Sequence, residues 1–333
     1  MQRLKNLCMV AALGAIVMGG CLLQSTSAYA ASTINVKAGG TTLSSALASA
    51  KSGDTIAISG TVTSGSVVVP AGVTISGKAG AGKINFSSTT GSSRGLTINT
   101  SGSTITDLEI YGAADNGIYM EGASNHLTNL KVHGNHDAGV QLSNGAANNT
   151  LTKVNSYSNA DAKGVNADGF AIKLHSGVGN TLTDCIAEGN SDDGYDLYAA
   201  HGAVTFTRCK AINNGNCGGI KGDGNGFKVG GVDNKTTGVA AHLDPLKHIL
   251  IDCTATGNTG SGFDRNNQNG VVTMTGCTGQ NNGKNNFNFP LTGAPSALGG
   301  KTVTFGVAIM TKCTSINGTN NIAGATLSGC IGF

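Results

Sequence analysis

Tryptophan is absent from this chain of 333 residues, only 4 prolines occur, and charged residues make up 12% of the sequence. So little charge, together with 39% apolar residues, excludes an intrinsically disordered chain, because disorder requires high charge and low hydrophobicity. Glycine is abundant instead, at 52 residues, which argues against a helix bundle because glycine weakens helix interiors. The composition therefore favours many short strands joined by tight turns.

The first residues have the features of an export signal. A basic start and an apolar stretch precede Ala28-Tyr29-Ala30, which offers small residues for cleavage. We therefore expect a signal peptide over residues 1–30 and a secreted, extracellular domain over residues 31–333. Glycines and serines break the apolar run early for a membrane anchor, and lipid attachment at Cys21 stays open as an alternative.

The charge balance gives no case for a nucleic-acid partner. The formal net charge is +3, and removal of Arg3 and Lys5 with the signal would leave +3 − 2 = +1. A nucleic-acid-binding domain is instead expected to carry a strongly basic face. We expect a monomer that binds no nucleic acid, with no membrane contact unless Cys21 is lipidated.

A recurring asparagine is the main organising signal of the chain. It stands at positions 135, 159, 190, 214, 258 and 282, with gaps of 24, 31, 24, 44 and 24 residues. A period of 24 residues with two insertions is typical of a solenoid that carries loops in some turns. The segments alternate apolar and polar residues and leave no room for helices, which favours an all-β, parallel solenoid.

The repeat assigns structural roles to several residues. Aligned residues of stacked coils lie about 4.8 Å apart, so the asparagines should form a ladder in which each side-chain amide bonds the next turn's backbone. The segment 43–60 begins with Leu43, Ala46, Leu47 and Ala50 on one helical face and then turns into a strand. We expect a short capping helix there, closing the open end of the stack.

Nine cysteines occur, of which Cys8 and Cys21 fall in the predicted signal peptide. Four others share one column of the repeat, where earlier coils have leucine and valine, so they should behave as small core residues; they are Cys185, Cys209, Cys253 and Cys277. Cys313 and Cys330 are a possible disulfide pair. No CxxC pair and no nearby histidine spacing occur, so zinc is not expected.

The segment GNSDDGYD (189–196) concentrates three aspartates in this weakly charged chain. Each coil has a Gly-aromatic pair, and the column before this glycine runs Ala138, Asp168, Asp193, Asn225, Ser261 and Asn285. Asp168 should therefore stack on Asp193, with Asp192 and Asp196 beside them and no basic residue among the four. Such a cluster destabilises the fold unless a cation intervenes, and several hard oxygen ligands favour Ca²⁺. A solvated acidic turn is the alternative.

The column after the aromatic residue brings a lysine to the same face. It runs Gln141, Ala171, Asp196, Lys228, Asp264 and Asn288. Lys228 should therefore lie one coil from Asp196, in a glycine-rich segment that leaves space for a ligand. A lone lysine is usually a surface charge, but one beside a cation site is a candidate for chemistry. The 44-residue gap that follows predicts a loop beside this cleft.

Three motifs on successive coils carry a resemblance to a known family: NADGF (166–170), NSDDGYDLY (190–198) and GNGFKVGG (224–231). With them the chain resembles the pectate lyases of polysaccharide lyase family 9. The resemblance implies a right-handed parallel β-helix of the pectin-lyase-like kind that cleaves polygalacturonate, the de-esterified chain of pectin, by Ca²⁺-dependent β-elimination. It matches Lys228 to the catalytic base, and it matches four aspartates to calcium ligands, namely Asp168, Asp192, Asp193 and Asp196.

The chain departs from that pattern at Arg265, where a neutral polar residue is expected. Arg265 and Lys173 could pair with substrate carboxylates, with Asp264 next to them, although both basic residues could equally be surface charges. Lys228 must be neutral to accept a proton, and Asp264 and Asp196 oppose this unless a metal neutralises them. We therefore expect an alkaline activity optimum.

Three alternative functions stay open. One is a polygalacturonase-type hydrolase, although the Gly-His-Gly and Arg-x-Lys motifs of those enzymes are missing. Another is a lyase for a different uronate polymer, such as alginate or rhamnogalacturonan. The third is a non-catalytic, Ca²⁺-stabilised β-solenoid that binds glycans, which the fold alone does not exclude.

Overall fold

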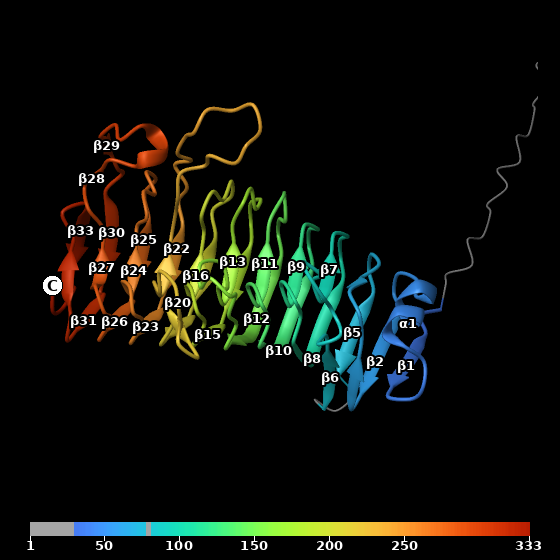
Figure 1. Cartoon of the computed structure of the whole chain (residues 1–333). Helices are drawn as coiled ribbons and strands as arrows, with labels where there is room; N and C mark the ends of the chain where they lie inside the picture. Colours follow the sequence, from blue (N-terminus) through green and yellow to red (C-terminus); the bar gives the residue numbers. More distant parts are fainter. Residues whose placement is uncertain (1–29, 78–80) are drawn as a thin grey trace, which may run out of the picture. The chain divides into compact units, whose positions relative to one another are not determined.

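The computed structural model describes residues 30–77 and 81–333, and residues Ala31–Phe333 form one compact unit. The predicted signal peptide, with Cys8 and the possible lipid attachment at Cys21, lies outside the described residues. Within the unit, short strands stack as successive coils along one axis, and the helix α1 (Leu43–Ser49) lies at the N-terminal end (Figure 1). No helix in the described part of the chain is long and apolar enough to span a membrane.

Two long parallel sheets run the length of the coils among the described residues. The first contains β1 (Thr33–Lys37), β2 (Thr55–Ser59), β3 (Thr61–Thr63), β5 (Thr74–Gly77), β6 (Gly82–Asn85), β8 (Thr104–Tyr111), β10 (His126–His133), β12 (Thr150–Tyr157), β14 (Thr181–Thr183), β15 (Ile186–Glu188), β17 (Thr205–Thr207), β18 (Lys210–Ile212), β22 (Ile249–Ile251), β23 (Thr254–Thr256), β25 (Thr273–Thr275), β26 (Thr278–Gln280), β30 (Ala308–Thr311), β31 (Thr314–Ile316) and β33 (Ala325–Ser328).

The second sheet carries the candidate site, and two small antiparallel pairs complete the described strands. It contains β4 (Val67–Val68), β7 (Leu96–Ile98), β9 (Ile118–Met120), β11 (Val140–Leu142), β13 (Phe170–Ile172), β16 (Tyr195–Asp196), β21 (Phe227–Lys228), β24 (Phe263–Asp264), β27 (Asn285–Asn288) and β32 (Thr319–Asn321). The antiparallel pairs are β19 (Asn216–Cys217) with β20 (Ile220–Lys221), and β28 (Thr292–Gly293) with β29 (Val303–Thr304); a 3₁₀ turn, η2 (Ser296–Leu298), lies between the latter two.

The predicted register between coils is confirmed. The amide of Gly139 donates to Asp168 O and the amide of Gly169 donates to Asp193 O, both at 3.0 Å. In the next column Asp196 pairs with Lys228, and Lys228 pairs with Asp264. The sequence therefore placed both columns of the second sheet correctly.

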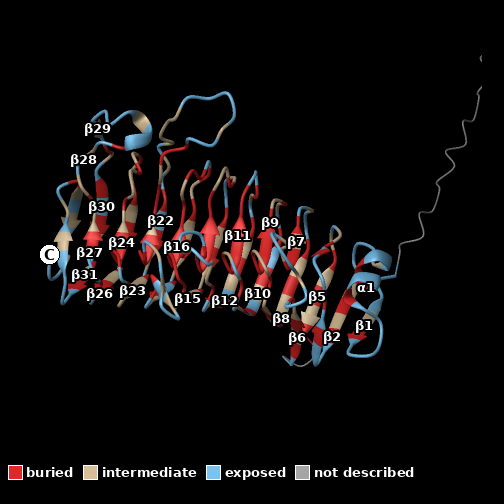
Figure 2. Cartoon of the chain, in the orientation of Figure 1, coloured by how far each residue is buried: buried red, intermediate tan, exposed pale blue. Residues whose placement is uncertain are grey.

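The aromatic residue of each pair is fully buried. Buried residues recur along the strands of successive coils (Figure 2). Five of these rings stack from coil to coil with centroids 4.5–5.0 Å apart: Phe170, Tyr195, Phe227, Phe263 and Phe287. The preceding glycine is required because a Cβ at Gly194 would lie 2.6 Å from Gly226 O. The Gly-aromatic pair is thus a packing element that lets neighbouring coils approach closely.

The asparagine ladder is confirmed, and its bonds run between side chains as well as to backbone. At each step the side-chain oxygen of one asparagine accepts from the backbone amide and side-chain amide of the previous coil's asparagine, as Asn214 does from Asn190 at 3.2 and 2.9 Å. A second ladder, which the sequence reading missed, contains Asn125, Asn149 and Asn180. Its gaps of 24 and 31 residues equal the first two gaps of the first ladder.

The cysteine column and the capping helix are as expected, with two differences. Buried Cys313 extends the column, because Thr314 pairs with Thr278 directly after Cys277. Cys313 and Cys330 are both free thiols, so the possible disulfide is not formed. Helix α1 begins after its N-cap Thr42, buries Leu43, Ala46 and Leu47, and ends at Ser49; Ala50 is its C-cap.

Candidate active and metal site

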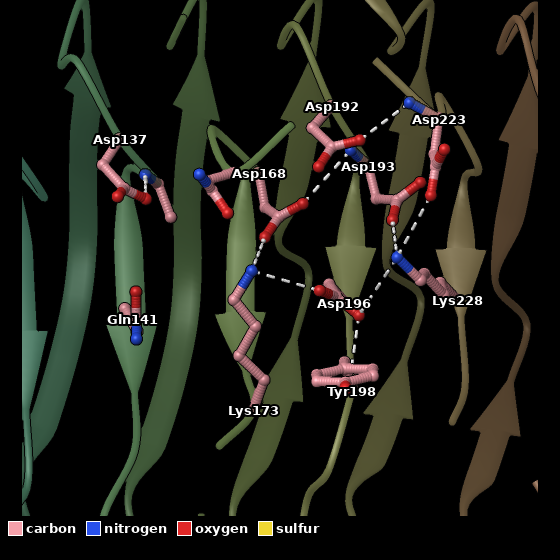
Figure 3. A network of polar contacts seen from close by, with 12 residues as sticks. Asp137, Gln141, Asp168, Lys173, Asp192, Asp193, Asp196, Tyr198, Asp223 and Lys228 are labelled. Atoms are coloured by element: carbon pink, nitrogen blue, oxygen red, sulfur yellow. Dashed lines mark hydrogen bonds and ion pairs between the residues drawn. The ribbon is translucent and has the colours of Figure 1, made fainter. Parts of the chain in front are cut away.

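Four aspartates meet on two neighbouring coils in the middle of the second sheet (Figure 3). Asp168 precedes β13, Asp192 and Asp193 precede β16, and Asp196 ends β16. Asp168, Asp192 and Asp193 each offer one carboxylate oxygen, and these oxygens lie within 4.8 Å of one another. The amide of Asp193 also donates to Asp168 Oδ1 at 3.2 Å, which holds the two coils in register.

Two lysines enter this cluster, which the sequence reading expected to contain no basic residue. Lys173 Nζ lies 2.6 Å from Asp168 Oδ2 and 3.1 Å from Asp196 Oδ2, and Lys173 is only 8% exposed. Lys173 follows β13, and its side chain runs back along this strand to Asp168 (Figure 3). It is therefore neither a surface charge nor an unpaired cation: it already bridges two of the predicted calcium ligands.

Lys228 approaches the cluster from the next coil. Its Nζ lies 3.0 Å from Asp193 Oδ2 and 3.9 Å from Asp196 Oδ1, as the predicted column requires. A third contact, 3.4 Å to Asp223 Oδ2, was not anticipated. Asp223 stands five residues before the lysine in the same glycine-rich turn, and this acidic neighbour was a signal that the sequence reading could have used. The amine thus lies among three carboxylates.

Burial dominates the protonation of the aspartates. Loss of hydration raises the pKa of Asp193 to about 7 and that of Asp192 to about 6, although Lys228 opposes both shifts. The pKa of Asp168 is likewise raised well above its usual value by burial, against the pull of Lys173. Asp196 differs: its burial is outweighed by the two lysines, so its pKa is lowered.

Burial alone would lower the pKa values of both lysines, but the carboxylates reverse this effect. The pKa of Lys228 is raised because Asp196 and Asp193 outweigh its desolvation. The pKa of Lys173 is raised in the same way by Asp168 and Asp196. Both amines are therefore charged at neutral pH, and each lies against carboxylates of the cluster.

The donor atoms fit an oxygen-liganded divalent cation. Asp193 Oδ2 is buried and accepts no hydrogen bond from any residue that the structure describes; its contact with Lys228 is an ion pair only. The three converging donors are all carboxylate oxygens, the ligand type that Ca²⁺ prefers. Burial raises the pKa values of Asp168 and Asp193, so a bound cation would offset the cost of keeping these two buried carboxylates ionised.

The other two predicted substrate-binding residues lie in different environments. Asp264 is half-buried beside Lys228, and its carboxylate accepts from the Asn266 amide at 2.7 Å and from Asn288 Nδ2 at 2.8 Å. Arg265 is fully buried, and its guanidinium donates to the carbonyl oxygens of Gln268, Gly306 and Gly324. A side chain so enclosed contacts no polymer, so Arg265 is a core residue and its prediction as a substrate or surface residue is wrong.

A different guanidinium lies along the same sheet. Arg94 lines a pocket that it shares with Asp115, Gln141 and Lys173, and its Nε lies 3.9 Å from Asp115 Oδ1. The Arg94 guanidinium carbon lies 3.3 Å from the ring centre of Tyr119, which fixes the orientation of the charged group. The sequence reading missed Arg94 because its coil precedes the asparagine repeat that defined the register.

Parallel coils and asparagine ladders define a β-helix protein, and the carboxylate cluster with its two lysines is its candidate site. Over residues 24–301 the chain matches the sequence profile of the family described as Pel9A-like, right handed beta helix region. The chain belongs to this family, which confirms both the right-handed β-helix and the resemblance to family 9 pectate lyases.

Individual relatives agree with this assignment. Pectate lyase L of Paenibacillus polymyxa (strain SC2) is 34% identical over 215 residues, which cover 59% of this chain and 46% of that protein. Pectate lyase L of Dickeya dadantii (strain 3937) is 39% identical over 142 residues, covering 40% of this chain and 31% of that protein. The match therefore spans less than half the length of these curated relatives. The crystal structure of pectate lyase Pel9A matches with a TM-score of 0.76 and 25% identity, over 90% of this chain and 79% of that one.

Proposed function

We propose that this protein is a secreted pectate lyase that cleaves polygalacturonate by Ca²⁺-dependent β-elimination. The observation that carries the proposal is the position of Lys228 Nζ, 3.0 Å from Asp193 Oδ2 at the edge of the aspartate cluster. The pectate lyases among its relatives support the same reaction. In this reaction the proton on C5, next to the uronate carboxylate, is removed and the oxygen on C4 leaves.

In this proposal Lys228 is the base that accepts the C5 proton, and Asp168, Asp192, Asp193 and Asp196 hold the cation. Bound Ca²⁺ would supply a Lewis acid for the uronate carboxylate and positive charge against the aspartates. Lys173 keeps Asp168 and Asp196 in place from the opposite side, at 2.6 and 3.1 Å. Asp264, next to Lys228 on the following coil, belongs to the wall of the substrate site.

Lys228 can accept a proton only in its neutral form, and the direction of its pKa shift sets the pH dependence. Since Asp196 and Asp193 raise the pKa of Lys228 above its usual value, the neutral fraction grows only as the pH rises into the alkaline range. A bound Ca²⁺ that offsets the negative charge of these carboxylates would lower the pKa of Lys228 and increase the fraction of neutral lysine. We therefore expect kcat to increase with pH on the alkaline side, and a rate that peaks in acid contradicts a lysine base.

The direct test is the ultraviolet absorbance of the unsaturated product on polygalacturonate, with Ca²⁺ and with a chelator. We expect the absorbance to grow only when Ca²⁺ is present. A hydrolase would release new reducing ends without any increase in this absorbance. Alginate and rhamnogalacturonan in parallel assays test the other uronate polymers. A glycan-binding protein would retain its affinity for polygalacturonate and form no product under any condition.

Export is a separate part of the proposal. Because the small residues at Ala28 and Ala30 precede the compact unit, we expect the mature protein to begin at residue 31. N-terminal sequencing of the protein from culture medium tests this, and size-exclusion chromatography tests the expected monomer. A fatty acid on Cys21 in mass spectrometry would replace free secretion by lipid anchoring.

A further inference from the structure

We infer that the loop between β21 and β22 (residues 229–248) carries a second metal site, for Zn²⁺ or a similar transition metal, and that the ion fastens this loop to the neighbouring coil. The site contains His201, Asp233, His242 and Asp244, whose ligand atoms all lie within 4.8 Å of one another. The loop stands out beyond the strand ends in Figure 1. This inference is independent of the proposed lyase activity.

The distances between the ligand atoms are those of a tetrahedral site. His201 Nε2 lies 3.0 Å from Asp233 Oδ2 and 3.9 Å from Asp244 Oδ2. His242 Nε2 lies 3.8 Å from Asp233 Oδ2 and 3.6 Å from Asp244 Oδ2. A regular tetrahedron with zinc–ligand bonds of about 2.0–2.2 Å has edges of about 3.3–3.6 Å. The four measured edges scatter around this length, so small side-chain rotations would complete the coordination.

The backbone of the loop places three of the four ligand side chains on the same side. Asp233 and His242 exchange two hydrogen bonds as an antiparallel bridge, from Asp233 N to His242 O at 2.9 Å and from His242 N to Asp233 O at 3.0 Å. Residues directly opposite in such a bridge point to the same side, and so does Asp244, two residues after His242. Asp233 is only 1% exposed, whereas His201 is exposed and His242 and Asp244 are half-buried, so Asp233 is the buried ligand of the site.

The hydrogen bond of His242 aims its other ring nitrogen at the site. His242 Nδ1 lies 3.0 Å from Ala240 O, and a carbonyl oxygen only accepts, so Nδ1 carries the hydrogen. The neutral ring then directs the lone pair of Nε2 toward two carboxylates at 3.6 and 3.8 Å. These two distances are too long for hydrogen bonds and are explained by a shared cation, although Asp233 Oδ2 also contacts His201 Nε2 at 3.0 Å and accepts from Thr236 Oγ1. Fixing of one ring nitrogen by a backbone carbonyl is also the usual arrangement around metal-bound histidine.

Imidazole and carboxylate ligands together distinguish this site from the aspartate cluster. Two ring nitrogens and two carboxylates suit Zn²⁺ and its neighbours in the first transition row, whereas Ca²⁺ selects oxygen. The absence of CxxC pairs and of closely spaced histidines led us to expect no zinc from the sequence. The fold overrides that expectation, because His201 and His242 are separated by 41 residues in sequence, 242 − 201 = 41, and meet only when the loop closes.

The test uses untagged mature protein, stripped with a chelator and titrated with Zn²⁺ in a calorimeter. We expect one equivalent to bind in wild type and at least about a 100-fold loss of affinity in the double variant His201→Gln, His242→Gln. The matched control is His126→Gln, His136→Gln, which removes two exposed histidines outside the loop and should bind as wild type. Co²⁺ in place of Zn²⁺ should give the intense visible absorption of tetrahedral cobalt in wild type and control only.

Limited proteolysis gives a readout of the loop itself. Lys235 is exposed on the loop, and Zn²⁺ should slow tryptic cleavage there at least about tenfold while cleavage at exposed Lys163 is unchanged. Circular dichroism must show that the double variant is folded. Absence of stoichiometric Zn²⁺ binding in wild type, equal binding in the double variant, or displacement of Zn²⁺ by millimolar Ca²⁺ would each overturn the site. The first outcome would mean that the histidines and aspartates form only a hydrogen-bonded network.

Discussion

Two columns of the same solenoid obey opposite rules. In the asparagine ladder every coil from residue 135 to residue 282 repeats the same residue, and each repeats the same pair of bonds, as between Asn159 and Asn190 at 3.1 and 2.8 Å. In the second sheet the column after the aromatic residue changes at every coil, from Gln141 through Ala171, Asp196, Lys228 and Asp264 to Asn288. Each column contributes one position per coil of the same solenoid, so the coil repeat alone does not dictate this variation.

The difference separates residues that stabilise the stack of coils from residues that are candidates for chemistry. A buried asparagine that satisfies its neighbours in every coil stabilises the stack. The variable column instead brings Asp196 and Lys228 together beside buried Asp193, whose raised pKa shows that its charge is costly in the fold. A repeat protein can tolerate that cost in one or two coils because the remaining coils are regular. Departure from the repeat is thus the signature of the functional site.

The sharpest test of this comparison is Lys228→Ala. Loss of the general base should reduce kcat on polygalacturonate by about 10²–10⁴-fold at saturating Ca²⁺, while Ca²⁺ affinity is kept or increased because a competing cation is gone. The measurement is product absorbance together with calorimetric Ca²⁺ titration. Lys210→Ala, on an exposed position of the first sheet, is the control and should keep wild-type activity. Unchanged turnover in the Lys228 variant would exclude it as the base.

Removal of a ladder asparagine should instead lower the stability of the fold. Asn214→Ala removes the oxygen that accepts from Asn190 N and Nδ2 and the amide that donates to Ala187 O and Asn258 Oδ1. It leaves buried polar groups unpaired, so we expect a loss of about 3 kcal/mol in the free energy of unfolding. Urea denaturation measures it, with exposed Asn35→Ala as the control. A loss below about 1 kcal/mol would mean that the ladder is dispensable.

The periodic part of the molecule could be predicted from the sequence because stacking converts sequence spacing into contact. Once Gly169 and Gly194 were aligned, the neighbours of Asp168 and Lys228 followed without any knowledge of loops. The second ladder was equally accessible, since Asn125, Asn149 and Asn180 repeat gaps already found. It was missed because it ends early: Val204 and His248 occupy the later coils, where Val204 N donates to His248 Nδ1 at 3.1 Å.

Side-chain direction and loop closure could not be predicted in this way. Lys173 lies after β13, and the column rule says nothing of a long side chain that runs back to Asp168. Arg265 follows β24 and turns into the core, where three carbonyl oxygens receive it; burial lowers its pKa to about 10. The histidine and aspartate cluster requires a loop that no repeat describes. The direction of these side chains and the closure of the loop depend on tertiary contacts, which the spacing of residues in the sequence does not predict.

His248 offers a smaller test of the same contrast, because it interrupts the second ladder. Burial lowers the pKa of His248 to about 3, from an ordinary value of about 6.5. The unfolded chain therefore binds a proton that the fold does not, and stability falls as the pH drops from about 6.5 toward 3. Between pH 7 and pH 4.5 this amounts to about 2–3 kcal/mol.

His248→Asn restores the ladder residue and removes the titrating group. We expect the loss of stability between pH 7 and pH 4.5 to shrink by about 2 kcal/mol relative to wild type, measured by urea denaturation at both values. His126→Asn, at an exposed position, should leave the pH dependence unchanged. If the His248→Asn and His126→Asn variants lose the same stability between pH 7 and pH 4.5, His248 does not control this loss.

The smallest expected effect concerns the early coils of the variable face, where Arg94 lines one pocket together with Lys173. If this guanidinium receives a uronate carboxylate several sugar units from the bond that is cleaved, it contributes to binding and not to the chemical step. Arg94→Ala should then raise KM for polygalacturonate about 3–10-fold and leave kcat nearly unchanged, because a half-exposed ion pair is worth about 1 kcal/mol. Arg208→Ala is the matched control, since Arg208 pairs with Asp184 on the first sheet. Trigalacturonate, which is too short to reach Arg94 from Lys228, should show no difference between variant and wild type. An equal fall in kcat for short and long substrates would instead place Arg94 among the residues that shape the catalytic coils, and the division between regular and variable columns would then begin earlier in the chain.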